Sequence, residues 1–393
     1  MSRKRTVVAA AALLAGALAL SACGGGGGGT GGGGGSDANT LKIGFMGDLT
    51  GENSGIVIPP RNGARMAFDA YNATNPPKKI ELVEYDSQGS ADQAVPLVNK
   101  AIQQDKIVGL IGPAFSGESK AADPVLEQAK IPNISPSATN PGLAQNGWKF
   151  FHRVVAPDSA QGPAIADFLI SAKSPKKAFV ISDDQEYSVG LADAVNQQLT
   201  AKGVPVQRDQ FAQAASDYSS SVAKIKADSP DVIFYGGYYA QAGRLLKQIR
   251  DAGVTAVFAT GDGSFDVGLI NGAGGPAAEG AVVSCPCAVP SASATQGALK
   301  AFYDQYKEKF KLDPAVYATE GYDAATAYVK AIQAGNTTAE TINTFLATLS
   351  FDGVAKPVKF QPDGDVVSTD IFVYQVKSGQ LALLGNTKDA KLG

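Results

Sequence analysis

From residue 41 onward, short continuous apolar runs alternate with longer segments in which apolar residues recur every three or four positions. The short runs are typical of strands buried on both faces, and the longer segments are typical of helices with one buried face. Strands are expected at residues 41–46, 79–85, 107–111, 178–181 and 232–235. Helices are expected at residues 62–71, 95–102, 191–199 and 245–249. This strand–helix–strand order predicts parallel α/β sheets with right-handed crossovers.

The alternation forms two blocks, residues 41–136 and 177–284, separated by a less regular stretch at 140–157. Two lobes also fit the length of 393 residues, which exceeds what one compact core usually supports. Further helices are expected at 298–310, 319–333 and 339–349, and closing strands at 357–361 and 370–376. We expect these late elements to return to the two lobes, which would create several hinge strands.

The first residues have the features of a bacterial export signal. Basic residues at 3–5 precede an apolar stretch at 7–20, and small residues stand just before Cys23. The segment Leu20-Ser21-Ala22-Cys23 is similar to the lipobox of bacterial lipoproteins, so Cys23 is expected to receive a diacylglyceryl group and become the mature N-terminus. The alternative is an ordinary signal peptide with an incidental cysteine.

A glycine-rich linker follows Cys23 and favours the lipobox. Residues 24–35 are all glycine except Thr30, and such a segment behaves as a flexible coil. We therefore expect a lipoprotein signal peptide at 1–22 and a lipidated cysteine with its linker at 23–40. The lipid would anchor the folded part to the membrane, on the extracytoplasmic face of the cell membrane.

The charge balance and the apolar runs exclude two classes of protein. The chain has a formal net charge of −3, and residues 1–22 carry three of its 34 bases and no acid, which leaves 31 bases against 37 acids in the rest. A mildly acidic body without a basic stripe argues against a nucleic-acid partner. No apolar run reaches the ~20 residues that a bilayer-spanning helix needs.

The usual catalytic motifs are missing from the sequence. His152 is the only histidine, and neither a Gly-x-Ser-x-Gly pattern nor a phosphate-binding or dinucleotide-binding glycine pattern occurs. One histidine and one Cys-Pro-Cys segment cannot supply a cluster of metal ligands. We therefore expect no enzyme activity, no cofactor and no metal site, and we expect His152 to be structural.

Cys285 and Cys287 are the cysteines other than Cys23. An exported protein permits a disulfide. Residues two apart in an extended strand lie about 6.5 to 7 Å apart, which is at the edge of disulfide reach. Both a disulfide and two unpaired structural cysteines remain open, and the spacing favours the unpaired interpretation.

The expected carboxyl ends of the strands carry residues suited to ligand binding, which takes place beyond these ends in parallel α/β lobes. Ser116 follows a strand and opens a helix, where it is expected to act as an N-cap and where free N–H groups favour an anion such as a carboxylate. Hydroxyl residues at 135–139 and aromatic residues at 235–239 end two other strands. Asp262 lies between two glycines at a further strand end, either as a structural turn residue or as a ligand group.

Several stretches between residues 41 and 377 resemble the leucine/isoleucine/valine-binding protein family of ABC-transporter substrate-binding proteins. They are Asn62-Gly63-Ala64-Arg65, Glu84-Tyr85-Asp86, Ser135-Pro136 with Ala138-Thr139-Asn140-Pro141, Gln161-Gly162-Pro163, Tyr235-Gly236-Gly237-Tyr238-Tyr239 and Ala278-Glu279-Gly280. The resemblance implies the type I periplasmic binding protein fold, an α/β fold of two Rossmann-like lobes with parallel central sheets joined by three hinge crossovers. The N-terminal lobe would comprise residues 41–157 and 288–364, and the C-terminal lobe residues 158–287 and 365–393.

The resemblance also implies roles for single residues in a cleft between the lobes. Ser116 and Thr139 fall where family members bind the ligand α-carboxylate, and Asp262 falls where an acid meets the α-ammonium group. Tyr187 and Tyr238 fall where the second lobe closes over the ligand. The full set of expected ligand-binding residues is Ile56, Phe115, Ser116, Ser137, Ala138, Thr139, Tyr187, Tyr238 and Asp262.

Three departures from the family pattern indicate that the pocket differs in shape. Asp262 stands where leucine-binding members carry the longer Glu, and Ile56 stands where they carry an aromatic residue at the cleft mouth. The family disulfide of the first lobe is lost, because its positions correspond to Gly89 and Phe115.

These features predict a monomeric solute-binding lipoprotein that captures an amino acid, branched-chain or another small aliphatic one, and delivers it to an ABC transporter permease. Amides, urea, short peptides and aromatic acids are alternative ligands, and a sensory domain of the same fold is an alternative function. A sensor is expected to continue into a transmembrane helix, whereas this chain reaches Gly393 through a polar tail, so transport is favoured.

Overall fold

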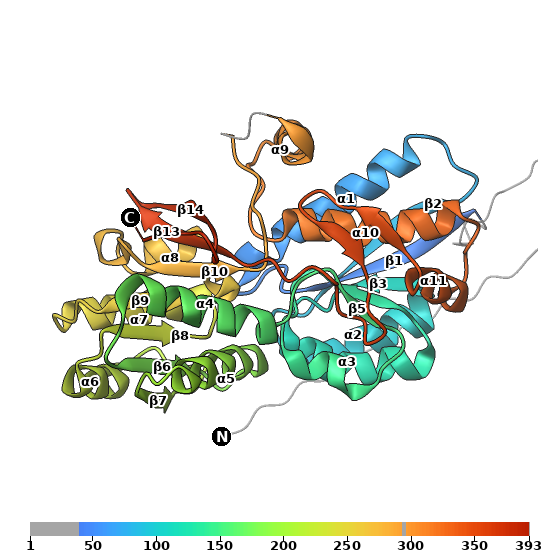
Figure 1. The fold of residues 1–393 in the computed structure, drawn as a ribbon. Coiled ribbons are helices and arrows are strands. Elements are labelled where there is room, and N and C mark those ends of the chain that lie inside the picture. The colour runs from blue at the N-terminus through green and yellow to red at the C-terminus, as the bar shows by residue number, and fades with distance from the viewer. Residues whose placement is uncertain (1–38, 293–295, 393) are drawn as a thin grey trace, which may run out of the picture. The chain divides into compact units, whose positions relative to one another are not determined.

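The computed structural model describes residues 39–292 and 296–392. The expected signal peptide, Cys23 and the linker up to residue 38 lie outside the described residues. The described chain is organised in two lobes, each built on its own sheet (Figure 1). None of the helices in these ranges combines the length and the apolar character that crossing a bilayer demands.

The first lobe contains a five-stranded parallel sheet with the strand order β2-β1-β3-β4-β5. Its strands are β1 (Thr40–Gly47), β2 (Lys79–Asp86), β3 (Gly109–Ile111), β4 (Asn133–Ser135) and β5 (Phe151–Arg153). Its helices are α1 (Ile58–Asn72), α2 (Ala91–Lys100), α3 (Ser116–Ala129), α10 (Ala318–Gln333) and α11 (Ala339–Leu346). Figure 1 shows α1 and α10 on one face of the sheet and α2 and α3 on the other, which covers both faces, as the buried strands require.

Helices α1 and α10 pack backbone against backbone because each contributes a glycine to the contact. A Cβ atom at Gly63 would lie 2.0 Å from the carbonyl oxygen of Ala318, and one at Gly321 would lie 2.0 Å from that of Pro60. Helix α10 also reaches the sheet, where the hydroxyl of Tyr328 donates to the carbonyl oxygen of Pro132 at 2.8 Å. An element from late in the chain therefore completes the first lobe.

The second lobe contains a seven-stranded sheet with the order β14-β13-β10-β9-β8-β6-β7. Strands β6 to β10 run parallel, and β13 and β14 pair antiparallel at one edge. The strands are β6 (Ala178–Ser182), β7 (Val206–Gln210), β8 (Val232–Tyr235), β9 (Val257–Thr260), β10 (Val282–Cys285), β13 (Phe372–Lys377) and β14 (Gln380–Asn386). The helices are α4 (Asp158–Lys173), α5 (Glu186–Ala201), α6 (Ser219–Asp228), α7 (Tyr239–Asp251) and α8 (Val267–Gly272).

The chain passes between the lobes three times. The crossings lie between β5 and α4, between β10 and α9 (Gly297–Phe310), and between β12 (Pro357–Lys359) and β13. The backbone N–H of Arg153 donates to the carbonyl oxygen of Gly364 at 3.0 Å, which joins the first crossing to the third. The ammonium group of Lys356 donates to the carbonyl oxygen of Pro286 at 2.8 Å, which holds the second crossing.

Cys285 and Cys287 form a disulfide, so the favoured interpretation of two unpaired cysteines is wrong. Their Cα atoms lie 5.0 Å apart, closer than two alternate residues of an extended strand. The reason is that β10 ends at Cys285, so the chain is free to turn at Pro286. The bridge therefore lies at the start of the second crossing.

Three strands near sheet edges differ from the sequence expectation. The strand expected at 357–361 forms as β12, but it pairs with β11 (Ser350–Asp352) in a separate two-stranded sheet. Strands β7 and β14 were not expected, and both lie at edges of the second sheet. Strand β7 carries polar and charged residues, as edge strands commonly do, so the apolar pattern that reveals central strands is absent from it.

Candidate functional site

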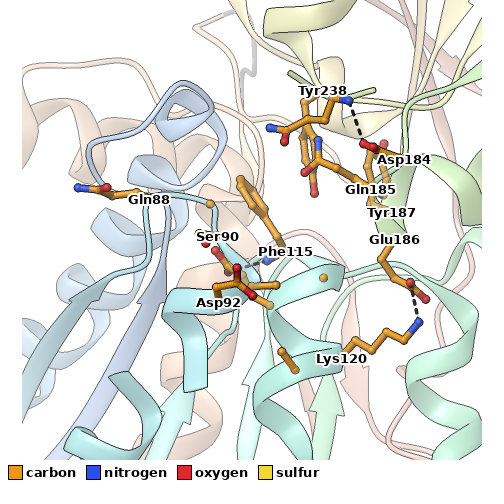
Figure 2. Close-up of a pocket in the computed structure, with 16 residues that line it drawn as sticks. Gln88, Ser90, Asp92, Phe115, Lys120, Asp184, Gln185, Glu186, Tyr187 and Tyr238 are labelled. Carbon is orange, nitrogen blue, oxygen red and sulfur yellow. Dashed lines mark hydrogen bonds and ion pairs between the residues drawn. The ribbon is translucent and has the colours of Figure 1, made fainter. Parts of the chain in front are cut away.

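A cavity of about 610 Å³ opens between the two lobes. The first lobe lines it with residues before and within α2 and α3, including Gln88, Asp92 and Lys120. The second lobe lines it with residues around the start of α5, including Asp184 and Gln185. Figure 2 shows the two sets of side chains facing each other across the opening.

Three buried aromatic residues form one side of this cavity. Phe115 comes from the first lobe, and Tyr187 and Tyr238 come from the second. The ring centroids of Phe115 and Tyr238 are 4.7 Å apart, and those of Tyr238 and Tyr187 are 4.9 Å apart. We call these three residues the aromatic wall. Because the row of rings bridges the lobes, it offers an apolar surface that depends on both of them.

Ser116 is the first residue of α3 rather than its N-cap, which corrects the sequence expectation. The residue before the helix is Phe115, and its backbone N–H donates to Glu118 Oε2 at 3.1 Å. The Ser116 hydroxyl instead accepts from the backbone N–H of Asn140 at 3.2 Å. Ser116 therefore joins the start of α3 to the loop that follows β4.

That loop, residues 136–140, is fixed by hydrogen bonds of the residues just before Thr139. The Ser137 hydroxyl donates to the carbonyl oxygen of Ala114 at 2.7 Å, and the Ala138 N–H donates to Ser135 Oγ at 3.0 Å. Thr139 is fully buried, and its hydroxyl oxygen makes no hydrogen bond that meets geometric criteria within the described residues. A buried hydroxyl of this kind is suited to a polar group of a ligand.

Asp262 lies directly behind the aromatic wall, at the end of β9. Its Oδ1 accepts from the Tyr187 hydroxyl at 3.0 Å, and its Oδ2 accepts from the Tyr317 hydroxyl. The glycines on either side are needed, because a Cβ at Gly261 would lie 2.8 Å from the Tyr187 hydroxyl oxygen and one at Gly263 would lie 2.5 Å from the Tyr187 ring. Tyr317 belongs to the first lobe, so the carboxylate is held by both lobes.

Asp158, the first residue of α4, is a second buried acid at this site. Its side chain is completely buried, and neither carboxylate oxygen has a hydrogen-bond partner of acceptable geometry among the described residues. Burial raises the pKa of Asp158 well above its ordinary value of 3.8, and the neighbouring Asp262 carboxylate raises it further. The Thr139 hydroxyl and the Arg153 guanidinium oppose this rise.

Burial also raises the pKa of Asp262, against the hydrogen bonds from Tyr317, Gln161 and Tyr187 that lower it. Two adjacent buried carboxyl groups cannot both ionise cheaply unless a positive charge joins them. The polar region behind the aromatic wall therefore favours a small cationic group, with hydroxyl oxygens nearby.

The comparisons with known proteins agree with this two-lobed arrangement. A sequence profile described as periplasmic binding protein matches residues 40–380. The chain belongs to this family. The leucine-specific-binding protein of Salmonella typhimurium is 30% identical over 341 residues, which cover 86% of this chain and 91% of that protein.

Solved structures show the same fold as this periplasmic binding protein. A leucine binding protein from Thermotoga maritima matches with a TM-score of 0.81 and 29% identity, covering 88% of this chain and 98% of that one. The branched-chain amino acid transporter substrate binding protein of Streptococcus pneumoniae, solved with isoleucine, matches with a TM-score of 0.80 and 26% identity, covering 88% and 99%. The predicted type I fold and the predicted family are confirmed.

The lobes of this periplasmic binding protein also touch through polar contacts. Lys120 forms an ion pair with Glu186 at 2.8 Å across the cavity, as Figure 2 shows. The side-chain amide of Asn140 donates to the Glu186 carbonyl oxygen at 2.9 Å. Glu52 of the first lobe contacts α7, where Arg244 pairs with its carboxylate at 2.5 Å. These contacts hold the lobes together around the site.

The structure distributes the residues expected from the sequence over two layers. Phe115, Tyr187 and Tyr238 line the cavity, and the others are buried and do not line it: Ser116, Ser137, Ala138, Thr139 and Asp262. Ile56 lies in a short 3-10 helix (Ser54–Ile56), where it packs in the apolar core and is not among the residues that line the cavity. Gly89 and Phe115, the positions of the lost family disulfide, are neighbours, since a Cβ at Gly89 would lie 3.3 Å from the Phe115 ring.

Sequence reasoning missed Asp158 and Tyr317. Asp158 begins a helix, where an acid is common for local reasons, so its sequence position carries no separate signal.

His152 was expected to be structural and is buried in β5 against the ring of Phe360, with centroids 4.9 Å apart. Burial lowers the pKa of His152 to about 4, so it is neutral near pH 7.

Proposed function

We propose that this periplasmic binding protein captures an amino acid between its lobes and delivers it to the permease of an ABC importer. The observation that carries the proposal is the buried Asp158 carboxyl group, which the Thr139 hydroxyl approaches without making a hydrogen bond of acceptable geometry and which sits beside a second buried acid, Asp262. An α-ammonium group supplies both the positive charge and the N–H donors that these acids require.

The other end of the ligand would meet the start of α3 and the loop around Thr139. The N-terminus of a helix attracts anions through its free N–H groups and its dipole, and α3 begins at Ser116. The Thr139 hydroxyl is a further donor for a carboxylate. A zwitterion therefore matches both charge preferences of the site.

The ligand side chain would lie against the aromatic wall. The faces of Phe115, Tyr187 and Tyr238 are apolar, which favours a branched-chain or another small aliphatic side chain. The names of the relatives support the same class, since one is described as leucine-specific-binding and one was solved with isoleucine.

The anchoring and the domain limits belong to the same proposal. Cys23 would carry the lipid that holds a monomeric protein at the extracytoplasmic face of the membrane, with signal peptide 1–22 removed. The lobe boundaries would lie near residues 157, 287 and 364, within the three crossings of the chain.

The alternative ligands fit the charges of the site less well. Amides, urea and aromatic acids lack an ammonium group, so they would leave Asp158 and Asp262 without a counter-charge. A short peptide keeps the ammonium group, but it must extend past the aromatic wall into the open cavity. A sensory domain would use the same site and differs only in its partner.

A thermal-shift screen tests the proposal. Purified folded protein is heated with each amino acid, with amides and urea, with short peptides and with benzoate. A ligand present at a hundred times its Kd stabilises the folded state by about 2.7 kcal/mol, so the small aliphatic amino acids are expected to raise the melting temperature most. A rise with amides, urea or benzoate alone would overturn the amino-acid assignment.

A further inference from the structure

Arg153 is a fully buried arginine at the end of β5, and it makes its hydrogen bonds around Thr139. Its Nη1 donates to the carbonyl oxygen of Ala138 at 3.1 Å and to that of Asn140 at 2.9 Å. These are the carbonyl groups on either side of Thr139. One guanidinium group therefore fixes the peptide unit between Ala138 and Thr139 and the peptide unit that follows Asn140.

The remaining backbone hydrogen bonds of this loop also hold it in place. The Thr139 carbonyl oxygen accepts from the backbone N–H of Asp158 at 2.9 Å, and the Asn140 N–H donates to Ser116 Oγ. Three consecutive carbonyl groups are thus held within the protein. Among the polar side chains of this loop, the Thr139 hydroxyl is the one without a hydrogen bond of acceptable geometry to the described residues.

Arg153 is held in turn by the third crossing of the chain. Its Nε donates to Asp365 Oδ1 at 2.6 Å, and its backbone N–H donates to Gly364. Gly364 has a φ of +87°, and a Cβ there would lie 2.1 Å from the Phe151 carbonyl oxygen, so the crossing lies directly on β5. A buried guanidinium requires a carboxylate partner, and the ion pair with Asp365 supplies it.

An arginine is required for this arrangement. The planar guanidinium directs separate N–H groups to a carboxylate and to two carbonyl oxygens at fixed angles, whereas the single ammonium group of lysine cannot reach all three. The positive charge also acts on the site, because it opposes the rise in the pKa of Asp158.

We propose that Arg153 is a positioning residue for ligand binding, which orients Thr139 and is itself oriented by Asp365 in the third crossing. The inference rests on the proposed function, since it assigns affinity to a residue outside the ligand site. Asp365 binds Arg153, and no hydrogen bond joins it to Thr139 within the described residues, so its effect on the ligand is expected to pass through Arg153. The crossing that connects the lobes is thereby linked to the geometry of the ligand site.

The test begins with the ligand-free protein. Asp365→Asn keeps the size of the side chain and removes its charge, and it is expected to speed amide hydrogen exchange in residues 136–140. Asp363→Asn is the matched control, because Asp363 is exposed two residues away and its amide retains the oxygen that accepts from the Asp365 N–H. Exchange that is equal in the two variants would overturn the positioning role, whatever the ligand is.

Calorimetry with L-leucine as the probe completes the test. In the wild-type background, Asp365→Asn is expected to weaken L-leucine binding about tenfold. In a Thr139→Ala background the same substitution is expected to weaken it less than about threefold, because the effects of coupled residues on binding free energy are not additive. Additive losses would show that Asp365 acts on the fold alone and would overturn the proposal. If Asp365→Asn does not fold, Asp365→Glu replaces it in the same comparison with Thr139→Ala. The glutamate keeps the negative charge but moves it away from its native position.

The two hypotheses fail in different ways. Wild-type protein that binds neither L-leucine nor any other amino acid contradicts the proposed function. The exchange experiment still decides whether Arg153 and Asp365 order the loop, since it requires no ligand.

Discussion

The two buried acids of the site differ in how the protein itself satisfies them. Asp262 accepts from the hydroxyls of Tyr187 and Tyr317, whereas Asp158 lacks hydrogen-bond partners of acceptable geometry in the described residues. Asp262 is therefore oriented by hydroxyl groups of the protein, whereas Asp158 has only the Thr139 hydroxyl beside it among the described residues. Both properties matter for a cation, since one acid provides a rigid counter-charge and the other provides acceptors.

Removing the charge of Asp262 is expected to weaken amino-acid binding strongly. Asp262→Asn keeps the shape and leaves the ammonium group without its counter-charge, which costs on the order of 3 kcal/mol, or about a hundredfold in Kd. Ser116→Ala removes one neutral donor and is expected to cost less, roughly 1.5 to 3 kcal/mol. Calorimetry measures both.

Asp266→Asn, in the same loop, is the control for Asp262→Asn, because an asparagine there still caps α8 through Gly268. Binding by Asp262→Asn within about threefold of the wild type would remove Asp262 from the site and favour amides or urea as ligands.

The raised pKa of Asp158 predicts a pH dependence of stability. Over a range of pH, the Asp158 carboxyl group keeps its proton in the folded state but has lost it in the unfolded chain, where its pKa has the ordinary value of 3.8. Unfolding then releases a proton, so this group lowers the stability of the ligand-free protein as the pH rises above about 3.8. Asp158→Asn cannot ionise and is expected to gain stability relative to the wild type with rising pH.

Urea unfolding at about pH 5 and about pH 8 measures this difference, with the exposed Asp184→Asn as control. A stability difference between Asp158→Asn and the wild type that is the same at both pH values would contradict the prediction.

At the residue scale, the sequence was most informative where the resemblance aligned single positions. Ser116, Thr139, Tyr187, Tyr238 and Asp262 follow strand ends or open helices, so a pattern of elements locates them. Tyr317 could not be found this way, because it reaches Asp262 only after the second crossing brings α10 back to the first lobe. Its backbone φ of +62° is unusual for tyrosine and has no sequence signal.

At the scale of elements, periodicity located the central strands and failed where tertiary contacts decide. Strands β6 and β8 are buried along their whole length, and each carries an apolar run. Strand β12 is apolar only at Val358, and its partner β11 is equally short, so the pattern gave no indication of a separate sheet. The pairing of Cys285 and Cys287 likewise depends on where β10 ends, which the sequence does not mark.

The contact between α1 and α10 predicts that Gly63 tolerates no side chain. In Gly63→Ala the new Cβ would meet the Ala318 carbonyl oxygen, which forces the helices apart, and overpacking of this kind costs about 1–3 kcal/mol. Ala70→Gly, on the exposed face of α1, sets the scale of a pure helix-propensity change of about 1 kcal/mol. Urea denaturation compares them, and a Gly63→Ala protein as stable as the wild type would refute the close contact.

At the scale of the molecule, two lobes joined by three crossings are expected to close on a ligand. Small-angle scattering should show a smaller radius of gyration when a stabilising amino acid is added. The control is Asp262→Asn with the same amino acid, at a concentration that saturates only the wild type. This variant should keep the larger radius of gyration of the ligand-free protein. An unchanged radius of saturated wild-type protein would rule out a large closure.

The expected lipid anchor gives a second prediction at this scale. Wild-type protein should partition with membranes and incorporate a labelled fatty acid, and Cys23→Ala should do neither, because the thiol is the expected attachment point. Wild-type protein recovered from the medium without lipid, with an N-terminus other than Cys23, would contradict the lipobox interpretation.

The close contact of Gly63 with α10 has a consequence for the order in which the chain folds. The two glycines at this contact, Gly63 and Gly321, are far apart in the chain, and the loop between them contains the five parallel strands β6 to β10 of the second lobe. Closing such a loop is slow, and the first lobe cannot complete its core before α10 has been synthesised. The nascent chain therefore stays incompletely folded until late in synthesis, in the unfolded form that passes through an export channel.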